Sequence, residues 1–296
     1  TTVLRAGNFG DSSLQGAAFV NQEYAWGPSG NFVKVGRLYY TFPVGDDLTV
    51  TAGPVVRTDD AGMYAGYATF YPSDLLVDFF TYGGAWATNN LSSTGSGAGA
   101  VYTIGDTGFS VSGNYVAYNG ADSAAGFGTD ESSSSSSWQL FYDGELGGGQ
   151  VLAQLGYSYE QNNGASFATS AGFDAMSSGD GEGYSVAAAW MPEDVGFIPS
   201  ISTGFSSFDA EGSSDEVEGW YVGLQWSDVF IEGNSFGAAI GSAPNTGDDD
   251  DNTIWEVFYS MAVTDNITIT PAVFGAESDG ADADSIGGLV KTTFSF

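Results

Sequence analysis

Apolar and polar side chains alternate at every second residue over most of this sequence. The stretch "WQLFYDGEL" places Trp138, Leu140 and Tyr142 on one face, and Gln139 and Phe141 with two acids on the other. The stretches "VLAQLGYSY", "WYVGLQW" and "IWEVFYSM" repeat the pattern. Successive side chains point to opposite faces of a β-strand, whereas a helix repeats after three or four residues, so the pattern predicts an all-β fold.

Fourteen segments alternate in this way, and most of them are about nine to eleven residues long. They begin near residues 1, 33, 48, 96, 108, 137, 150, 183, 197, 217, 235, 253, 267 and 285. This length exceeds that of the average globular strand and suits a tilted strand that crosses a bilayer. No stretch reaches the roughly 18 apolar residues of a transmembrane helix.

Short and long connections alternate between these segments. Short turns are expected at 43–47, 105–107, 147–149, 192–196, 228–234 and 264–266, and long polar loops at 9–32, 58–95, 119–136, 160–182, 209–216, 243–252 and 276–284. Outer-membrane barrels have short periplasmic turns and long extracellular loops. The alternation therefore predicts a transmembrane antiparallel up-and-down β-barrel with 14 strands in this chain. This barrel is expected to occupy residues 1–296, and no second domain is expected within them.

Some details of this barrel also follow from local sequence. The low-complexity run "ESSSSSS" (131–137) is expected in an external loop. Pro54, Pro199 and Pro271 lie inside expected strands, so we place them at bulges or where pairing ends. Trp220 and Trp226 share a face, six residues or ~20 Å apart, which fits aromatic girdles on either side of a lipid-facing band. The expected girdle residues are Trp220, Trp226, Trp255, Phe294 and Phe296.

The charge balance excludes several functions. There are 37 acidic residues against five basic ones, a formal net charge of −32, so nucleic-acid binding is not expected. The chain contains no Cys and no His, which excludes disulfides, thiolate sites and a Ser–His nucleophile. No enzymatic activity and no cofactor are expected. The acids avoid the expected lipid face, and clusters such as 248–251 and 279–284 lack the spacing of a calcium loop, so no metal site is expected.

Four stretches resemble one family: "LRAGNFG" (4–10), "GRLYYTFPVGDDLTV" (36–50), "FYSMAVTDNITITPAVF" (258–274) and the closing "VKTTFSF". They are similar to the barrel portion of the cyanobacterial outer-membrane porins, the surface-layer-homology-tethered major porins or iron uptake porins, which are related to the carbohydrate-selective porins. The resemblance implies a sixteen-stranded homotrimeric barrel in outer-membrane lipid and lipopolysaccharide. It also implies an N-terminal domain that binds peptidoglycan-linked polysaccharide, absent here together with two strands, and a terminal aromatic residue that the assembly machinery reads.

The longest loop, 58–95, is expected to fold into the barrel and narrow it, as the third loop does in general porins. Its stretch "MYAGYATFYPSDLLVDFF" is too apolar for a solvated loop. The alternation places Arg5, Arg37 and Arg57 on inward faces of neighbouring strands, opposite acids of this loop. Together these would create a transverse field across the pore. The expected constriction residues are Arg5, Arg37, Arg57, Asp59, Asp60, Asp74 and Asp78.

Other inward-facing charges leave an alternative open. Lys291, Asp143, Glu145 and Glu256 are expected to face the lumen, and Lys34 to meet solvent. Arg5 and Arg37 could instead pair with Glu145 or Asp143 and brace the wall. The expected function is passive diffusion of small hydrophilic solutes and inorganic ions, with a preference for cations. The alternative is a plugged structural or adhesive barrel whose acidic loops bind divalent cations or partners.

Overall fold

The computed structural model describes residues 1–7, 30, 32–72, 75–89, 91, 94–162, 179–194, 196–211, 216–242, 252–278 and 285–295. Its strands are β1 (Thr2–Arg5), β2 (Lys34–Val44), β3 (Leu48–Val56), β4 (Gly95–Thr103), β5 (Phe109–Ala117), β6 (Ser134–Glu145), β7 (Gly149–Gln161), β8 (Gly181–Pro192), β9 (Ser200–Ala210), β10 (Val217–Ser227), β11 (Ser235–Ser242), β12 (Asn252–Thr264), β13 (Ile267–Ser278) and β14 (Ser285–Phe294). Two helices of four residues each, α1 (Asp78–Thr81) and α2 (Trp86–Asn89), lie between β3 and β4.

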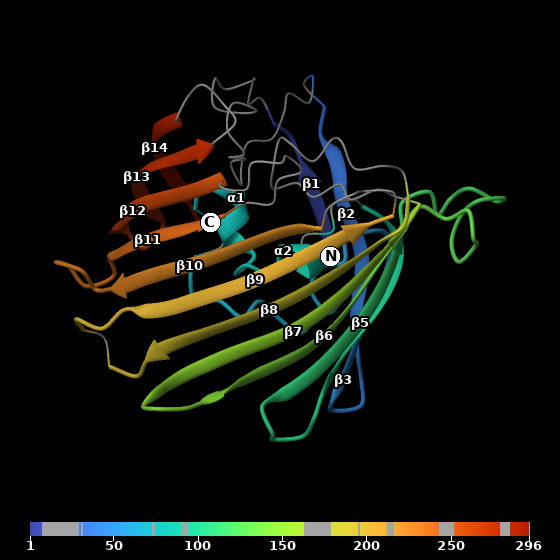
Figure 1. Cartoon of the computed structure of the whole chain (residues 1–296), viewed down its shortest axis with the longest axis horizontal. Helices are drawn as coiled ribbons and strands as arrows, with labels where there is room; N and C mark the ends of the chain where they lie inside the picture. Colours follow the sequence, from blue (N-terminus) through green and yellow to red (C-terminus); the bar gives the residue numbers. More distant parts are fainter. Residues whose placement is uncertain are drawn as a thin grey trace.

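The fourteen strands form one antiparallel sheet in which each strand pairs with its neighbours in the sequence. Figure 1 shows this sheet curving around α1 and α2, and we call the side toward these helices the inner face. In the described part of the chain, β1 and β14 form the two edges of the sheet. The predicted fold class is confirmed, and all fourteen strands begin within three residues of the predicted positions.

The alternation of side chains sorts the two faces as expected. In β7, Leu152, Gln154 and Ser158 are buried on the inner face, while Leu155 between them is exposed on the outer face. Short turns join the strands at one end of the sheet, for example at residues 146–148 between β6 and β7. There Gly147 and Gly148 both have positive φ, 63° and 73°, a conformation that glycine adopts without strain.

The expected positions of the prolines are confirmed. Pro54 lies where the pairing of β3 with β4 shifts register, between Gly53 and Val56. Pro199 precedes the first residue of β9. Pro271 lies in a gap of the β12–β13 ladder, between the pairs Phe258–Ala272 and Met261–Ile269. Each proline therefore falls where its missing N–H is not needed for a ladder hydrogen bond.

Two expectations about polar residues were wrong, one of them in part. Of the run 131–137, residues 131–133 lie in the connection between β5 and β6, but Ser134–Ser137 open β6 and are buried on both of its faces. Their hydroxyls find polar partners: Ser135 donates to the carboxylate of Glu160. The acids also do not avoid the outer face, since Glu182, Asp209 and Glu218 lie on it in β8, β9 and β10. All three lie near the long-loop ends of their strands, where an outward charge can reach water.

No helix in the described ranges is long and apolar enough to span a bilayer.

Candidate constriction site

The described residues of the segment between β3 and β4 (57–72, 75–89, 91 and 94) form a second layer on the inner face of the sheet, and we call this segment the inner loop. Its first limb, residues 57–72, begins against β2 and β3, where Asp60 contacts Arg37 and Ala61 contacts Thr51, and then follows the wall from β5 to β12. Its second limb, residues 75–89 and 91, returns over β11 to β7. Side chains of the first limb are mostly half-buried, whereas those described in the second limb are all buried. The first limb is therefore the surface that the inner loop presents to the interior.

Polar side chains of successive strands hold the first limb. The side-chain amide of Asn114 on β5 donates to the carbonyl oxygens of Thr58 and Met63, at 3.0 and 2.9 Å. On β6, the amide of Gln139 pairs with Gly66 in both directions: Oε1 accepts from its N–H at 3.2 Å and Nε2 donates to its carbonyl at 2.6 Å. These bonds replace those that the loop backbone would otherwise make with water.

Three serines fasten the loop in a similar way. On β9, the Ser202 hydroxyl accepts from the N–H of Phe70 at 2.8 Å, and the Ser206 hydroxyl donates to the carbonyl of Gly84 at 2.6 Å. On β7, the Ser158 hydroxyl donates to the carbonyl of Ala87 at 2.6 Å. The second limb thus lies directly on the wall, and short side chains leave it room to do so.

A glycine contact brings the loop backbone closest to the sheet. A Cβ atom at Gly204 of β9 would lie 2.1 Å from the carbonyl oxygen of Gly83, and one at Gly84 would lie 2.5 Å from the carbonyl carbon of Gly204. Gly83 and Gly84 also have positive φ, 63° and 78°. Glycine is required here both for the turn and for the close approach.

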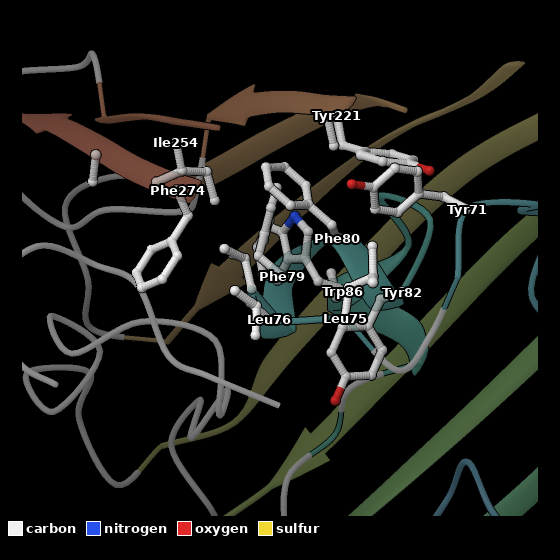
Figure 2. Close-up of a cluster of buried hydrophobic side chains, with 14 of the residues drawn as sticks. Tyr71, Leu75, Leu76, Phe79, Phe80, Tyr82, Trp86, Tyr221, Ile254 and Phe274 are labelled. Atoms are coloured by element: carbon white, nitrogen blue, oxygen red, sulfur yellow. The ribbon is translucent and has the colours of Figure 1, made fainter. Parts of the chain in front are cut away.

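An apolar cluster fills the space between the second limb and strands β9–β13. Figure 2 shows Phe79, Phe80 and Trp86 of the loop beside Tyr221, Ile254 and Phe274 of the wall. Trp86, Phe79 and Tyr221 are all 0% exposed. Because this cluster excludes water, the second limb is part of the folded core. The apolar side chains that the sequence shows in this loop therefore stabilise its position on the sheet.

Two ion pairs hold the start of the inner loop. Nε of Arg37 on β2 lies 2.7 Å from the Asp60 carboxylate, which also accepts the backbone N–H of Arg57 at 2.7 Å. The Arg57 guanidinium donates two hydrogen bonds to the Asp59 carboxylate, and its Nε lies 2.6 Å from Oδ1. The Tyr67 hydroxyl donates to Oδ2 of Asp59 at 3.2 Å. Two of the arginines expected at the constriction, Arg37 and Arg57, therefore contact two of the expected acids directly.

These contacts shift the pKa values of loop side chains. Burial alone would lower the pKa of Arg57, but the Asp59 carboxylate outweighs it, and the pKa lies well above the ordinary arginine value. Burial, reinforced by the charge of Asp59, raises the pKa of Tyr64 and of Tyr67. Arg57 is charged at neutral pH, and both tyrosines stay neutral.

The remaining expected residues lie in different places. Arg5 is half-buried on β1 with its side chain over Gly36, and within electrostatic range of Arg37 and Arg57. Asp78 is buried in α1, where the Tyr82 hydroxyl is 3.4 Å from Oδ1. Asp74 and Phe296 lie outside the described residues. Lys34 is exposed on β2.

Asp143 and Glu145 lie at the short-turn end of β6, where they line a hollow beside the 146–148 turn with Glu193. Nε2 of Gln150 donates to Asp143 at 2.8 Å. The alternative that Arg37 pairs with one of these acids is wrong, because Asp60 of the loop takes that position.

Glu256 and Lys291 lie on the inner face of β12 and β14, but neither carboxylate oxygen of Glu256 is open to the interior. Glu256 is 1% exposed beneath the inner loop. It accepts hydrogen bonds from the Tyr71 hydroxyl at 2.8 Å and the Val77 N–H at 3.0 Å. Among the expected girdle residues, Trp220, Trp226, Trp255 and Phe294 lie on the outer face.

Sequence reasoning missed the residues that seat the loop, above all Asn114, Gln139, Gln154 and Ser206. Their signal was present, because each is a polar residue in the inward register of its strand. A side-chain amide that faces water in the lumen and one that binds a loop occupy the same inward-facing positions of a strand. The alternation could therefore identify these residues but not their hydrogen-bond partners.

One continuous up-and-down antiparallel sheet with a long segment packed on its inner face is the fold of the outer-membrane porin barrels. The chain superposes on OprB of Pseudomonas putida with a TM-score of 0.66 at 15% identity, over 99% of this chain and 81% of that one. It also matches the trimer form of OmpT, an outer membrane protein of Vibrio cholerae, with a TM-score of 0.53, 15% identity and 90% and 79% coverage. The match to OccK1 of Pseudomonas aeruginosa has a TM-score of 0.51 and 12% identity, and it covers 86% of this chain and 67% of that one.

No protein-family model matches the chain. An uncharacterized protein of Nostoc sp., alr4550, is 33% identical over 128 residues, which are 38% of this chain. The match spans about a fifth (21%) of the length of that relative. The comparisons therefore show the fold, and the cyanobacterial porin family of the resemblance stays a prediction.

Proposed function

We propose that this chain is the barrel of an outer-membrane porin, a passive diffusion channel for small hydrophilic solutes and inorganic ions. The observation that carries this proposal is the inner loop, which is fastened along β5–β12 and presents its half-buried first limb to the interior. Such a layer narrows a barrel from one side. The permeation path would then run between the first limb and the wall of β14 and β1.

The constriction residues of this proposal are those at the neck of the loop: Arg5, Arg37, Arg57, Asp59 and Asp60. Because Asp59 and Asp60 are paired with arginines, they add little net negative charge. A preference for cations would instead come from acids at the two mouths, such as Asp143, Glu145 and Glu193 at the short-turn end and Glu182 and its neighbours at the other. Acidic mouths raise the local concentration of cations.

The assembly expected from the resemblance also belongs to this proposal. Sixteen strands are proposed from the resemblance alone. Unpaired backbone groups of β1 and β14 cannot remain exposed to lipid, so in a membrane these two edges would pair with each other or with further strands. A homotrimer in contact with lipid and lipopolysaccharide, and a tether to peptidoglycan-linked polysaccharide outside this sequence, are proposed from the resemblance alone. The same holds for membership of the cyanobacterial family and for iron species or carbohydrates as solutes.

Planar-bilayer recording tests the proposal. Stepwise conductance increments and a reversal potential of cation-selective sign in a KCl gradient are expected, and the triple variant D143N/E145Q/E193Q should shift that potential toward zero. Liposome swelling with sugars of increasing size would then give the size limit. Clear anion selectivity of the native protein would refute the cation preference.

The second candidate is a plugged structural or adhesive barrel. It is favoured by the three apolar clusters on the inner face, which fill part of the interior with packed side chains. Correctly folded protein that inserts into bilayers but gives no conductance, and causes no swelling even with the smallest sugar, would favour this candidate over the porin.

A further inference from the structure

Glu256 on β12 receives hydrogen bonds from both sides of the bend in the inner loop. One carboxylate oxygen accepts from Tyr71, the end of the first limb, and the other accepts from Val77, the start of the second. The bend between these residues is thus held at both of its ends by one side chain of the wall. Glu256 is 1% exposed and lies too deep to contact a solute in the interior.

We propose that Glu256 is a positioning residue for the constriction, which fixes how far the first limb stands from the opposite wall. This inference rests on the proposed porin function and assigns it a determinant outside the solute path. Removing the carboxylate would release the bend, and the first limb would then fluctuate into and out of the path. The width of the channel would depend on a residue that never lines it.

The surroundings of Glu256 favour a strong attachment. The Tyr71 ring packs edge-on against Phe258 at 5.8 Å, Tyr221 at 6.0 Å and Phe80 at 6.2 Å. Water is excluded from this site, and hydrogen bonds are stronger in such a low-dielectric interior than in water. The titratable groups that face Glu256 are Tyr71, Tyr221 and Lys291.

The distribution of charge along the loop points to the same role. Between its ends the loop is held by neutral side chains of Ser, Asn and Gln, each making ordinary hydrogen bonds. Ionisable side chains hold it at the neck, through Arg37 and Asp60, and at the bend, through Glu256. The first limb therefore lies between two attachments made by ionisable side chains on different parts of the sheet.

The test compares Glu256→Gln, which keeps the shape of the side chain, Glu256→Ala, and Tyr71→Phe, which removes one hydrogen bond without changing β12. Glu218→Gln is the matched control, because it makes the same charge change on the outer face of β10. A single cysteine, Leu76→Cys, reports on the bend in the otherwise cysteine-free chain, and Ala85→Cys reports on the rest of the second limb. Both native side chains are buried, 5% exposed or less.

The expected result is faster thiol labelling of Leu76→Cys, by about tenfold or more, in Glu256→Ala, because two buried hydrogen bonds to the carboxyl group are lost. Glu256→Gln and Tyr71→Phe should give smaller increases that do not add when combined. Labelling of Ala85→Cys, and all labelling in Glu218→Gln, should match the native rate. Open-channel current in Glu256→Ala should be noisier than in the native protein.

Native labelling rates in the Glu256 variants would overturn the inference, and so would faster labelling with an unchanged channel current. If the native protein itself does not conduct, the porin function fails. The labelling experiment then still tells whether Glu256 holds the bend.

Discussion

The side-chain amides of Asn89 and Gln154 pair with each other in both directions. Nδ2 of Asn89 lies 3.2 Å from Oε1 of Gln154, and Nε2 of Gln154 lies 3.0 Å from Oδ1 of Asn89. Both residues are 5% exposed or less, so water cannot replace either bond. The pair joins α2 at the end of the second limb to the middle of β7, and it explains why a polar residue is retained at a buried position of the wall.

Gln154→Leu should destabilise the folded barrel by ~1–3 kcal/mol, because the amide of Asn89 would be buried without a partner. The midpoint of urea unfolding in detergent, followed by tryptophan fluorescence, measures this. Gln150→Leu is the control, since Gln150 is near the short-turn end of the same strand and bonds to the exposed Asp143. The double variant Asn89→Leu/Gln154→Leu should recover part of the loss; a loss equal to the sum of both would contradict the pairing argument.

Arg37→Met should cost ~3 kcal/mol or more, because it leaves the Asp60 carboxylate in a largely buried site without its partner. Lys34→Met, on the same strand but exposed, should change the unfolding midpoint little. Adding Asp60→Asn to Arg37→Met should restore most of the stability. Equal effects of the two methionine variants would show that the ion pair does not hold the neck of the loop.

Gly204→Ala should displace the second limb, because the new methyl group would meet the carbonyl oxygen of Gly83. Overpacking of this kind costs ~1–3 kcal/mol. Gly288→Ala on β14 is a matched strand variant, since its Cβ would have only one neighbour, at 3.8 Å. Protease sensitivity of the loop should increase in Gly204→Ala alone, and unchanged digestion of both variants would refute the close approach.

The outer face gives a test of membrane insertion. Val222→Arg places a charge between Trp220 and Trp226 on the outer face of β10, and it should reduce the stability of the protein folded in bilayers by ~2–4 kcal/mol. Glu218→Arg, four residues away on the same face, lies near the long loop and should cost much less. Similar costs for both substitutions would mean that this face does not span the hydrocarbon region.

The fold could be predicted because its signal is repeated many times. One misplaced residue hardly affects fourteen alternating segments, and the positions of Pro54 and Pro271 followed from the missing N–H alone. The serine run shows where this reasoning fails. Low complexity suggested an exposed loop, but Ser134–Ser137 form a strand because Glu160 and Asn114 on the neighbouring strands bind their hydroxyls. That information lies in other strands and not in the run itself.

The constriction was predictable in part, for a related reason. The inward register of Arg37 and the acids of the inner loop could be read directly, and the structure brings Arg37 to Asp60 and Arg57 to Asp59. The alternation of apolar and polar residues could not predict the path of the inner loop. Glu256 faces inward as the register requires, yet the bend of the loop covers it, and only a contact over 185 positions of sequence reveals this.

The seat of the inner loop is made almost entirely by strands that follow it in the chain. Phe70 is hydrogen-bonded to Ser202, 132 positions later in the sequence, and Tyr71 to Glu256, 185 positions later. A chain built from its first strand onward would carry this segment undocked, with its aromatic side chains uncovered, until β12 is in place. The inner loop would then narrow the interior among the last events of assembly. A chaperone that covers exposed apolar side chains would be needed most before the later strands of the sheet have formed.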